Sequence, residues 1–189
     1  MRLAPYAPNV FLVLIIASWA ALFLFSSPDE FVEYIGVDNG YLLVLLLSFI
    51  SGLSVFGLAP YHLALIAVAA AGLNPYFLAL LATLGLAIGD STSYFLGYQG
   101  RTLIPQRMER AVEKVSAFLK RHEGQLPIYI FLYGALAPFS NDFVGVTLGL
   151  ARHPFWRVML PLSLGTLVFN TAVALSAPYA YELLETLLQ

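Results

Sequence analysis

The chain has 189 residues, of which 60% are hydrophobic and only 11% are charged, and its mean hydropathy is +0.81. A soluble domain of this size needs more charged surface, so the composition predicts a single all-α domain that is integral to the membrane. The absence of cysteine excludes disulfides and thiolate metal sites, and a net charge of −2 without a basic patch gives no sign of nucleic-acid binding.

Residues 9–25 form the first uncharged apolar segment, which we interpret as an uncleaved transmembrane helix. Its 17 residues are at the short end for a membrane span, so a cleaved signal peptide is the alternative. No small-x-small cleavage site follows, which favours the uncleaved helix. An acidic loop, residues 26–40, comes next.

Residues 41–72 are apolar but are broken between Gly57 and Pro60. Proline has no N–H to donate and disfavours helix in the residue before it. We therefore predict two half-length helices that enter the membrane and return to the same side, which is a re-entrant hairpin. Residues 75–98 are then long enough for a full transmembrane span.

The second half of the chain begins with its most charged segment. Residues 104–123 carry apolar side chains at three- and four-residue steps, which predicts an amphipathic helix at the cytoplasmic membrane surface. A solvated linker helix is the alternative. Residues 126–150 are a second broken apolar segment, with Gly134 and Pro138 at the predicted break, and residues 157–181 are the last predicted span.

The positions of the basic residues predict the topology. All nine Lys and Arg residues fall at position 2, within 101–121 or within 152–157. The positive-inside rule places these segments and the N-terminus in the cytoplasm, for a multi-pass protein of the plasma membrane. If residues 41–72 crossed the bilayer, residues 101–121 would lie outside. The charges therefore favour hairpins that enter from opposite sides.

The two broken segments share a series of landmarks. Each has a Gly before Ala-Pro-aromatic, then Gly-Leu, then a Pro followed by two aromatic residues, then a further Gly. Two interrupted apolar segments at corresponding places point to an inverted repeat with a binding site between the breaks. Chance similarity between apolar stretches rich in Gly and Pro is the alternative.

Acidic residues inside apolar segments are the candidate translocation site. A carboxylate near the membrane centre costs about 2.5–3.5 kcal/mol, so such residues face the protein interior or a water-filled cavity. We predict that Asp90 belongs to the site, with packing against a neighbouring helix as the alternative. Ser140, Asn141 and Asp142 are predicted to line a polar cavity, and capping of the half-helix that follows is compatible with that role.

His62 follows the first break and is predicted to bind substrate or to relay a proton with a carboxylate. A packing histidine is the alternative. The sequence contains no Gly-rich phosphate loop, metal-ligand spacing or Ser-x-x-Lys arrangement, so we predict no enzymatic activity, no cofactor and no metal. The residues around the two aspartates do not resemble the motifs of intramembrane aspartyl proteases.

One motif resembles that of a known family. Gly85, Gly89-Asp90, Tyr94, Gly97 and Gly100-Arg101 resemble the Gly-Asp-x-x-x-Tyr-x-x-Gly-x-x-Gly stretch of the DedA family, a branch of the VTT (SNARE-associated Golgi protein) superfamily. The resemblance covers about residues 40–176 and implies two opposed re-entrant hairpins among transmembrane helices. Family members are implicated in lipid movement across bilayers, which implies membrane lipids, and as a second candidate protons, as partners.

The chain departs from the DedA pattern at three positions. His62 stands where the family usually carries an acidic residue, and Ala135 and Asn141 stand where it usually carries arginines. Arginine pairs with phosphate in a bidentate way, so these departures indicate a divergent member with a different or less selective lipid substrate. We predict a scramblase or flippase of a phospholipid or lipid-linked phosphate. A proton- or ion-coupled solute transporter and a non-transporting scaffold are the alternatives, and a homo-oligomer is compatible with the sequence.

Overall fold

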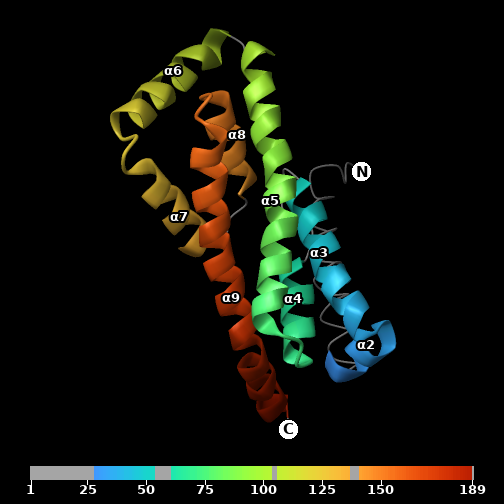
Figure 1. The fold of residues 1–189 in the computed structure, drawn as a ribbon. Helices are drawn as coiled ribbons and strands as arrows, with labels where there is room; N and C mark the ends of the chain where they lie inside the picture. The colour runs from blue at the N-terminus through green and yellow to red at the C-terminus, as the bar shows by residue number, and fades with distance from the viewer. Residues whose placement is uncertain (1–27, 54–60, 104–105, 137–140, 189) are drawn as a thin grey trace, which may run out of the picture.

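The computed structural model describes residues 28–53, 61–103, 106–136 and 141–188, and every regular element in these ranges is a helix (Figure 1). The predicted span 9–25 and four predicted site residues, Gly57, Pro60, Pro138 and Ser140, lie outside the described residues. The helices are α2 (Pro28–Ile35), α3 (Val37–Leu53), α4 (Tyr61–Ala70), α5 (Pro75–Gly100), α6 (Gln106–Arg121), α7 (Leu126–Leu136), α8 (Asp142–Leu150) and α9 (Phe155–Leu188), with a short 3₁₀ turn, η1 (Arg101–Leu103).

Two helices of the described part, α5 and α9, are long and apolar enough to cross a membrane. They run side by side along the centre of the bundle (Figure 1). Large apolar side chains are exposed in stripes at helical spacing, as expected of surfaces that face lipid tails. These stripes include Leu42, Leu46 and Ile50 on α3, Leu80, Leu84 and Ile88 on α5, and Leu160, Leu164 and Val168 on α9. The all-helical, membrane-type architecture predicted from the composition is therefore confirmed.

Shorter apolar helices pack around this central pair. Helix α3 packs along α5, and α7 packs along α9, so the two sit on opposite flanks (Figure 1). The start of α3 lies beside the end of α4, because a side chain at Gly40 would touch Val68 and Leu73. Helix α3 therefore enters the bundle and α4 returns to the end where α3 began.

Glycines allow the flanking helices to approach the central pair closely. A Cβ atom at Gly85 of α5 would lie 2.5 Å from the carbonyl oxygen of Leu45 on α3. A Cβ atom at Gly134 of α7 would lie 2.7 Å from the carbonyl oxygen of Leu162 on α9. Backbones this close require small residues at the crossing. Gly134 is thus a packing residue inside α7, and our prediction that it marks the break of the second hairpin is wrong.

The α4–α5 and α8–α9 connections have the same geometry, 80 residues apart. In both, one residue adopts a left-handed backbone after the helix end: Gly72 with φ 82° and Arg152 with φ 53°. This is a Schellman arrangement, in which two N–H groups satisfy the last carbonyls of the helix. The bonds are Gly72 to Ala69 and Leu73 to Val68 in the first turn, and Arg152 to Gly149 and His153 to Leu148 in the second.

The left-handed backbone at Gly72 gives a first prediction. Gly72→Ala should lower stability by about 1 kcal/mol, because an L side chain is strained at this φ. Lack of space is not the cause, since no atom lies within 4 Å of a Cβ placed there. Thermal unfolding of the purified protein in detergent would measure the effect. Gly124→Ala, equally open and without positive φ, is the control, and equal melting temperatures for the two variants would contradict the prediction.

Candidate functional site

A polar cluster lies where the start of α8 meets α5 and α9. The amide nitrogen of Asn141 donates to Asp90 Oδ2 at 2.9 Å and to Thr166 Oγ1 at 3.3 Å. The hydroxyl of Ser93 donates to Asp142 Oδ1 at 2.6 Å. Asp90 and Asp142 are each 3% exposed, so both carboxylates are enclosed by the protein. The structure therefore brings together three predicted site residues, Asp90, Asn141 and Asp142, which we call the α8 cluster together with Ser93 and Thr166.

The side chains of the α8 cluster are directed across helices rather than along them. Asn141 occupies the N-cap position of α8 but forms no side-chain capping bond. On α5, Ser91 and Thr92 bond to carbonyls of their own helix, whereas Ser93 reaches Asp142 on α8. For Asn141, capping does not explain the side chain, and its bonds connect the two halves of the chain.

A second polar cluster joins α4 to the central pair. The hydroxyl of Tyr61 donates to Asn170 Oδ1 at 3.3 Å, and Asn170 Nδ2 donates to Thr83 Oγ1 at 3.1 Å. Asn170 is fully buried. We call Tyr61, Thr83 and Asn170 the α4 cluster. The sequence analysis assigned none of these residues to the site, and it also missed Ser93 and Thr166.

The two clusters correspond by position in the chain. Asn170 stands 80 residues after Asp90, and Asn141 stands 80 residues after Tyr61, the same separation as between the two turns. Each cluster joins the start of a short helix in one half to the long helix of the other half. Continuing the separation of Gly85 and Gly165 to neighbouring polar residues is the sequence signal by which the α4 cluster could have been found.

The structure places His62 away from Asp90. Its ring lies 3.8 Å from the ring of Tyr61, measured between centroids, and 5.7 Å from that of Phe169. Its described contacts are with aromatic rings rather than with the carboxylate of Asp90. This arrangement matches the packing alternative for His62 and gives no support to a relay with Asp90.

The remaining motif residues hold the helices in register. A Cβ atom at Gly89 would lie 2.5 Å from the backbone of Gly52 on α3, and one at Gly97 would overlap Val146 on α8. Tyr94 is 3% exposed, and its hydroxyl donates to the carbonyl oxygen of His153 at 2.5 Å. The motif thus fixes α5 against α3, α8 and the α8–α9 turn, and it positions Asp90 and Ser93.

The chemistry available to the α8 cluster is hydrogen bonding by carboxylate, amide and hydroxyl groups. Buried polar groups are stable when they are paired in this way, while unpaired ones cost about 1–3 kcal/mol each. No group of three or more His, Asp or Glu side chains within the described residues is placed to hold a metal ion. A polar molecule that exchanged its own hydrogen bonds for those of the cluster would fit this donor and acceptor set.

Comparison with known families matches residues 59–177 to the VTT domain. The chain belongs to the VTT domain family. The matched region of the VTT domain contains both polar clusters, from Tyr61 to Asn170, and the resemblance inferred from the Gly-Asp-Tyr-Gly motif is confirmed. VTT domain proteins are membrane-associated and are generally not enzymes, and roles like those of transporters or flippases are often proposed for them. No curated protein and no solved structure matches the chain.

Proposed function

We propose that this VTT domain moves a lipid, or a lipid-linked headgroup, across the cytoplasmic membrane. The observation that carries the proposal is the α8 cluster, a set of buried polar side chains between two helices long enough to span a bilayer. Asp90 lies ten residues before the end of α5, about 15 Å by helical rise, which is half the thickness of a bilayer core. Polar groups at that depth mark substrate paths.

The proposal includes an inverted repeat built from α3–α4–α5 and α7–α8–α9. Three correspondences support it: the two Schellman turns, the two polar clusters, and the glycine crossings. A Cβ atom at Gly85 would meet Leu45 and Phe49 on α3, and one at Gly165 would meet Phe131 and Ala135 on α7 with the same four-residue spacing. Residues 41–72 and 126–150 are then two hairpins that enter from opposite sides, and the headgroup passes their polar tips while its chains stay in lipid.

The proposed orientation follows the basic residues. With Arg152, Arg157 and helix α6 in the cytoplasm, α7–α8 enters from the cytoplasmic side and α3–α4 from the outside. The N-terminus is then cytoplasmic, provided that residues 9–25 form a span. In this orientation α6 lies along the cytoplasmic membrane surface, and the protein is a multi-pass protein of the plasma membrane.

The composition of the α8 cluster suggests a headgroup class. Its charged members are the carboxylates Asp90 and Asp142, and Ala135 and Asn141 replace the arginines that would pair with a phosphate. Carboxylates and amides form strong hydrogen bonds with ammonium and hydroxyl groups. We therefore expect zwitterionic or hydroxylated phospholipids to be better substrates than a lipid whose headgroup is a bare phosphate.

Reconstitution tests this function directly. Purified protein in liposomes with fluorescent phosphatidylethanolamine should expose inner-leaflet lipid to a membrane-impermeant quencher, faster than protein-free liposomes do. Asp142→Ala should slow this exchange at least tenfold, because it removes a buried carboxylate and leaves Ser93 without its acceptor. Asp38→Ala, at an exposed position on α3, is the matched control and should leave the rate unchanged.

Two results would count against the proposal. The first is that the wild-type protein moves none of the fluorescent phospholipids tested, including a phosphatidic acid analogue. The second is that Asp142→Ala and Asp38→Ala exchange lipid at the same rate. In either case, uptake of small solutes by the same liposomes would examine the rival transporter function.

A further inference from the structure

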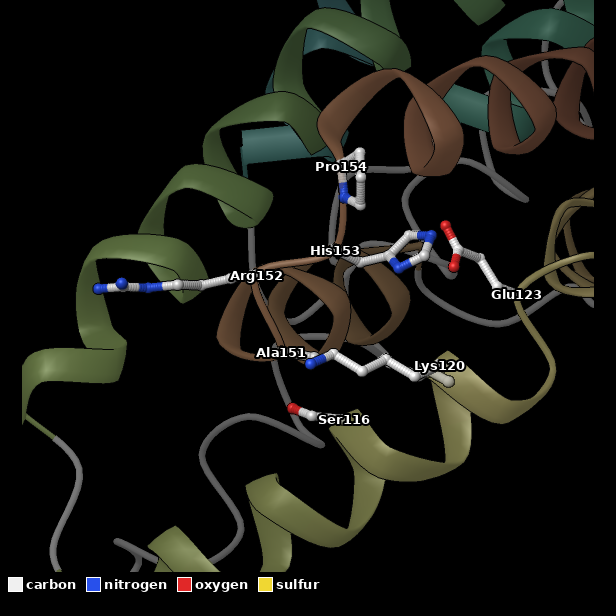
Figure 2. Close-up of a pocket in the computed structure, with 8 residues that line it drawn as sticks. Ser116, Lys120, Glu123, Ala151, Arg152, His153 and Pro154 are labelled. Atoms are coloured by element: carbon white, nitrogen blue, oxygen red, sulfur yellow. The ribbon is translucent and has the colours of Figure 1, made fainter.

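A pocket of about 140 Å³ lies between α6 and the α8–α9 turn, apart from both polar clusters (Figure 2). It is formed where the last turns of α6 approach the residues that follow α8. A water molecule occupies about 30 Å³ in the liquid, so the pocket has room for a tetrahedral oxyanion. Its lining residues are Ser116, Leu119, Lys120, Glu123, Ala151, Arg152, His153 and Pro154.

Three groups that can donate hydrogen bonds line this pocket without a partner among the described residues. His153 is 9% exposed, and its Nε2 atom is fully enclosed and makes no hydrogen bond. The hydroxyl oxygen of Ser116 is likewise enclosed and unbonded. Lys120 extends from α6 toward the α8–α9 turn, and no carboxylate in the described part of the chain pairs with it (Figure 2). Buried polar atoms normally have partners, so these orphaned donors indicate a missing acceptor.

The charges around the pocket favour an anion over a cation. Glu123, the acidic residue that lines it, forms an ion pair with Arg157 of α9, which neutralises its charge. The guanidinium of Arg152 lies 5.2 Å from the ring centroid of Tyr98, and its side chain points away from His153 (Figure 2). Lys120 therefore remains as an uncompensated positive charge, which opposes a metal ion and attracts an anion.

We propose that this pocket binds an oxyanion of the phosphate class, with Lys120 Nζ, His153 Nε2–H and Ser116 Oγ–H as the donors. Three donors from two elements suit a tetrahedral anion, because its oxygens accept hydrogen bonds in several directions. The ligand is either a lipid phosphomonoester at the membrane surface or a free phosphate. Binding would tie α6 to the α8–α9 turn. This site is separate from the path proposed for lipid movement and does not depend on it.

The site should bind more tightly as the pH falls. Burial lowers the pKa of His153, the carboxylate of Glu123 raises it, and the guanidinium of Arg157 lowers it. The charged groups facing His153 are thus Glu123 from the α6–α7 connection, Arg157 from α9 and Lys120 from α6. Because the net shift is downward, the imidazole is neutral at pH 7.5 and gains a charge below its ordinary value of about 6.5. That charge adds to the attraction for an anion.

Calorimetric titration of the full chain in detergent with sodium sulfate and sodium phosphate, at constant ionic strength in chloride, tests the site. Sulfate stays doubly charged between pH 5.5 and 8, so a change in its affinity reports the protein. We expect sulfate to bind several-fold more tightly at pH 5.5, and Lys120→Gln and His153→Gln to weaken binding at least fivefold. His153→Gln should also remove the pH dependence.

Lys114→Gln is the matched control, because Lys114 is an exposed residue of α6 that does not line the pocket. Competition by micelles containing phosphatidic acid, but not by phosphatidylcholine micelles, would assign the site to a lipid phosphomonoester. Competition by phosphate alone would assign it to the free anion. No sulfate or phosphate binding above the chloride background, or equal binding by Lys120→Gln and Lys114→Gln, would overturn the proposal. Lys120 is exposed, so its replacement keeps the test valid even if His153→Gln fails to fold.

Discussion

Gly89→Ala is expected to lower the melting temperature of the protein in detergent by several degrees. A Cβ atom at this position would lie 2.5 Å from the carbonyl carbon of Gly52 and 2.7 Å from the carbonyl oxygen of Phe49. Both are backbone atoms of α3, so no side chain can rotate away and the two helices must separate. Overpacking of this kind costs about 1–3 kcal/mol, and for a chain of this length each kcal/mol corresponds to roughly 2–4 °C.

Gly100→Ala is the matched control for this prediction. Gly100 is also a helical glycine of α5, but nothing lies within 4 Å of a Cβ placed there. Alanine favours helix over glycine, so this change should be neutral or slightly stabilising. Intrinsic fluorescence during heating gives both melting temperatures. If Gly89→Ala melted with the wild type, α3 and α5 would not cross as closely as the structure has them.

The sequence predicted the long elements well because their signals are local. Hydropathy predicted spans at 75–98 and 157–181, and the apolar helices are α5 (Pro75–Gly100) and α9 (Phe155–Leu188). Periodicity predicted an amphipathic helix at 104–123, where α6 covers Gln106–Arg121. Each signal depends on residues within a few turns of one another. Asp90 and Asp142 were also identified locally, since a carboxylate stands out in an apolar segment.

The partners of those carboxylates were harder to predict because they depend on contacts between distant segments. Asn141 was expected to line a cavity, but only the packing of α8 on α5 and α9 shows that it bonds both Asp90 and Thr166. Tyr61 and Asn170 carry no local signal, since each is an ordinary residue for its helix until 109 positions are closed between them. Gly134 was misplaced because a glycine near a proline resembles a break whether it bends the chain or packs a helix.

The two polar clusters allow charge to be separated from packing, and this gives the second large prediction. Asp90→Asn keeps an oxygen that accepts from Asn141 but removes the negative charge. It should reduce lipid exchange at least tenfold while the melting temperature stays within a few degrees. Asn170→Leu removes the acceptor of Tyr61 in the α4 cluster, and an unsatisfied buried hydroxyl costs about 1–3 kcal/mol. This variant should melt lower yet exchange lipid within about threefold of wild type.

Exchange rates per folded, reconstituted molecule and melting temperatures of the same preparations measure both effects. The crossed pattern separates a headgroup contact from a structural one, because Asp90 and Asn170 occupy corresponding positions on α5 and α9. Wild-type exchange in Asp90→Asn would remove its carboxylate from the path. Equal loss of exchange in both variants, with equal loss of stability, would mean that each cluster serves only to hold the two halves together.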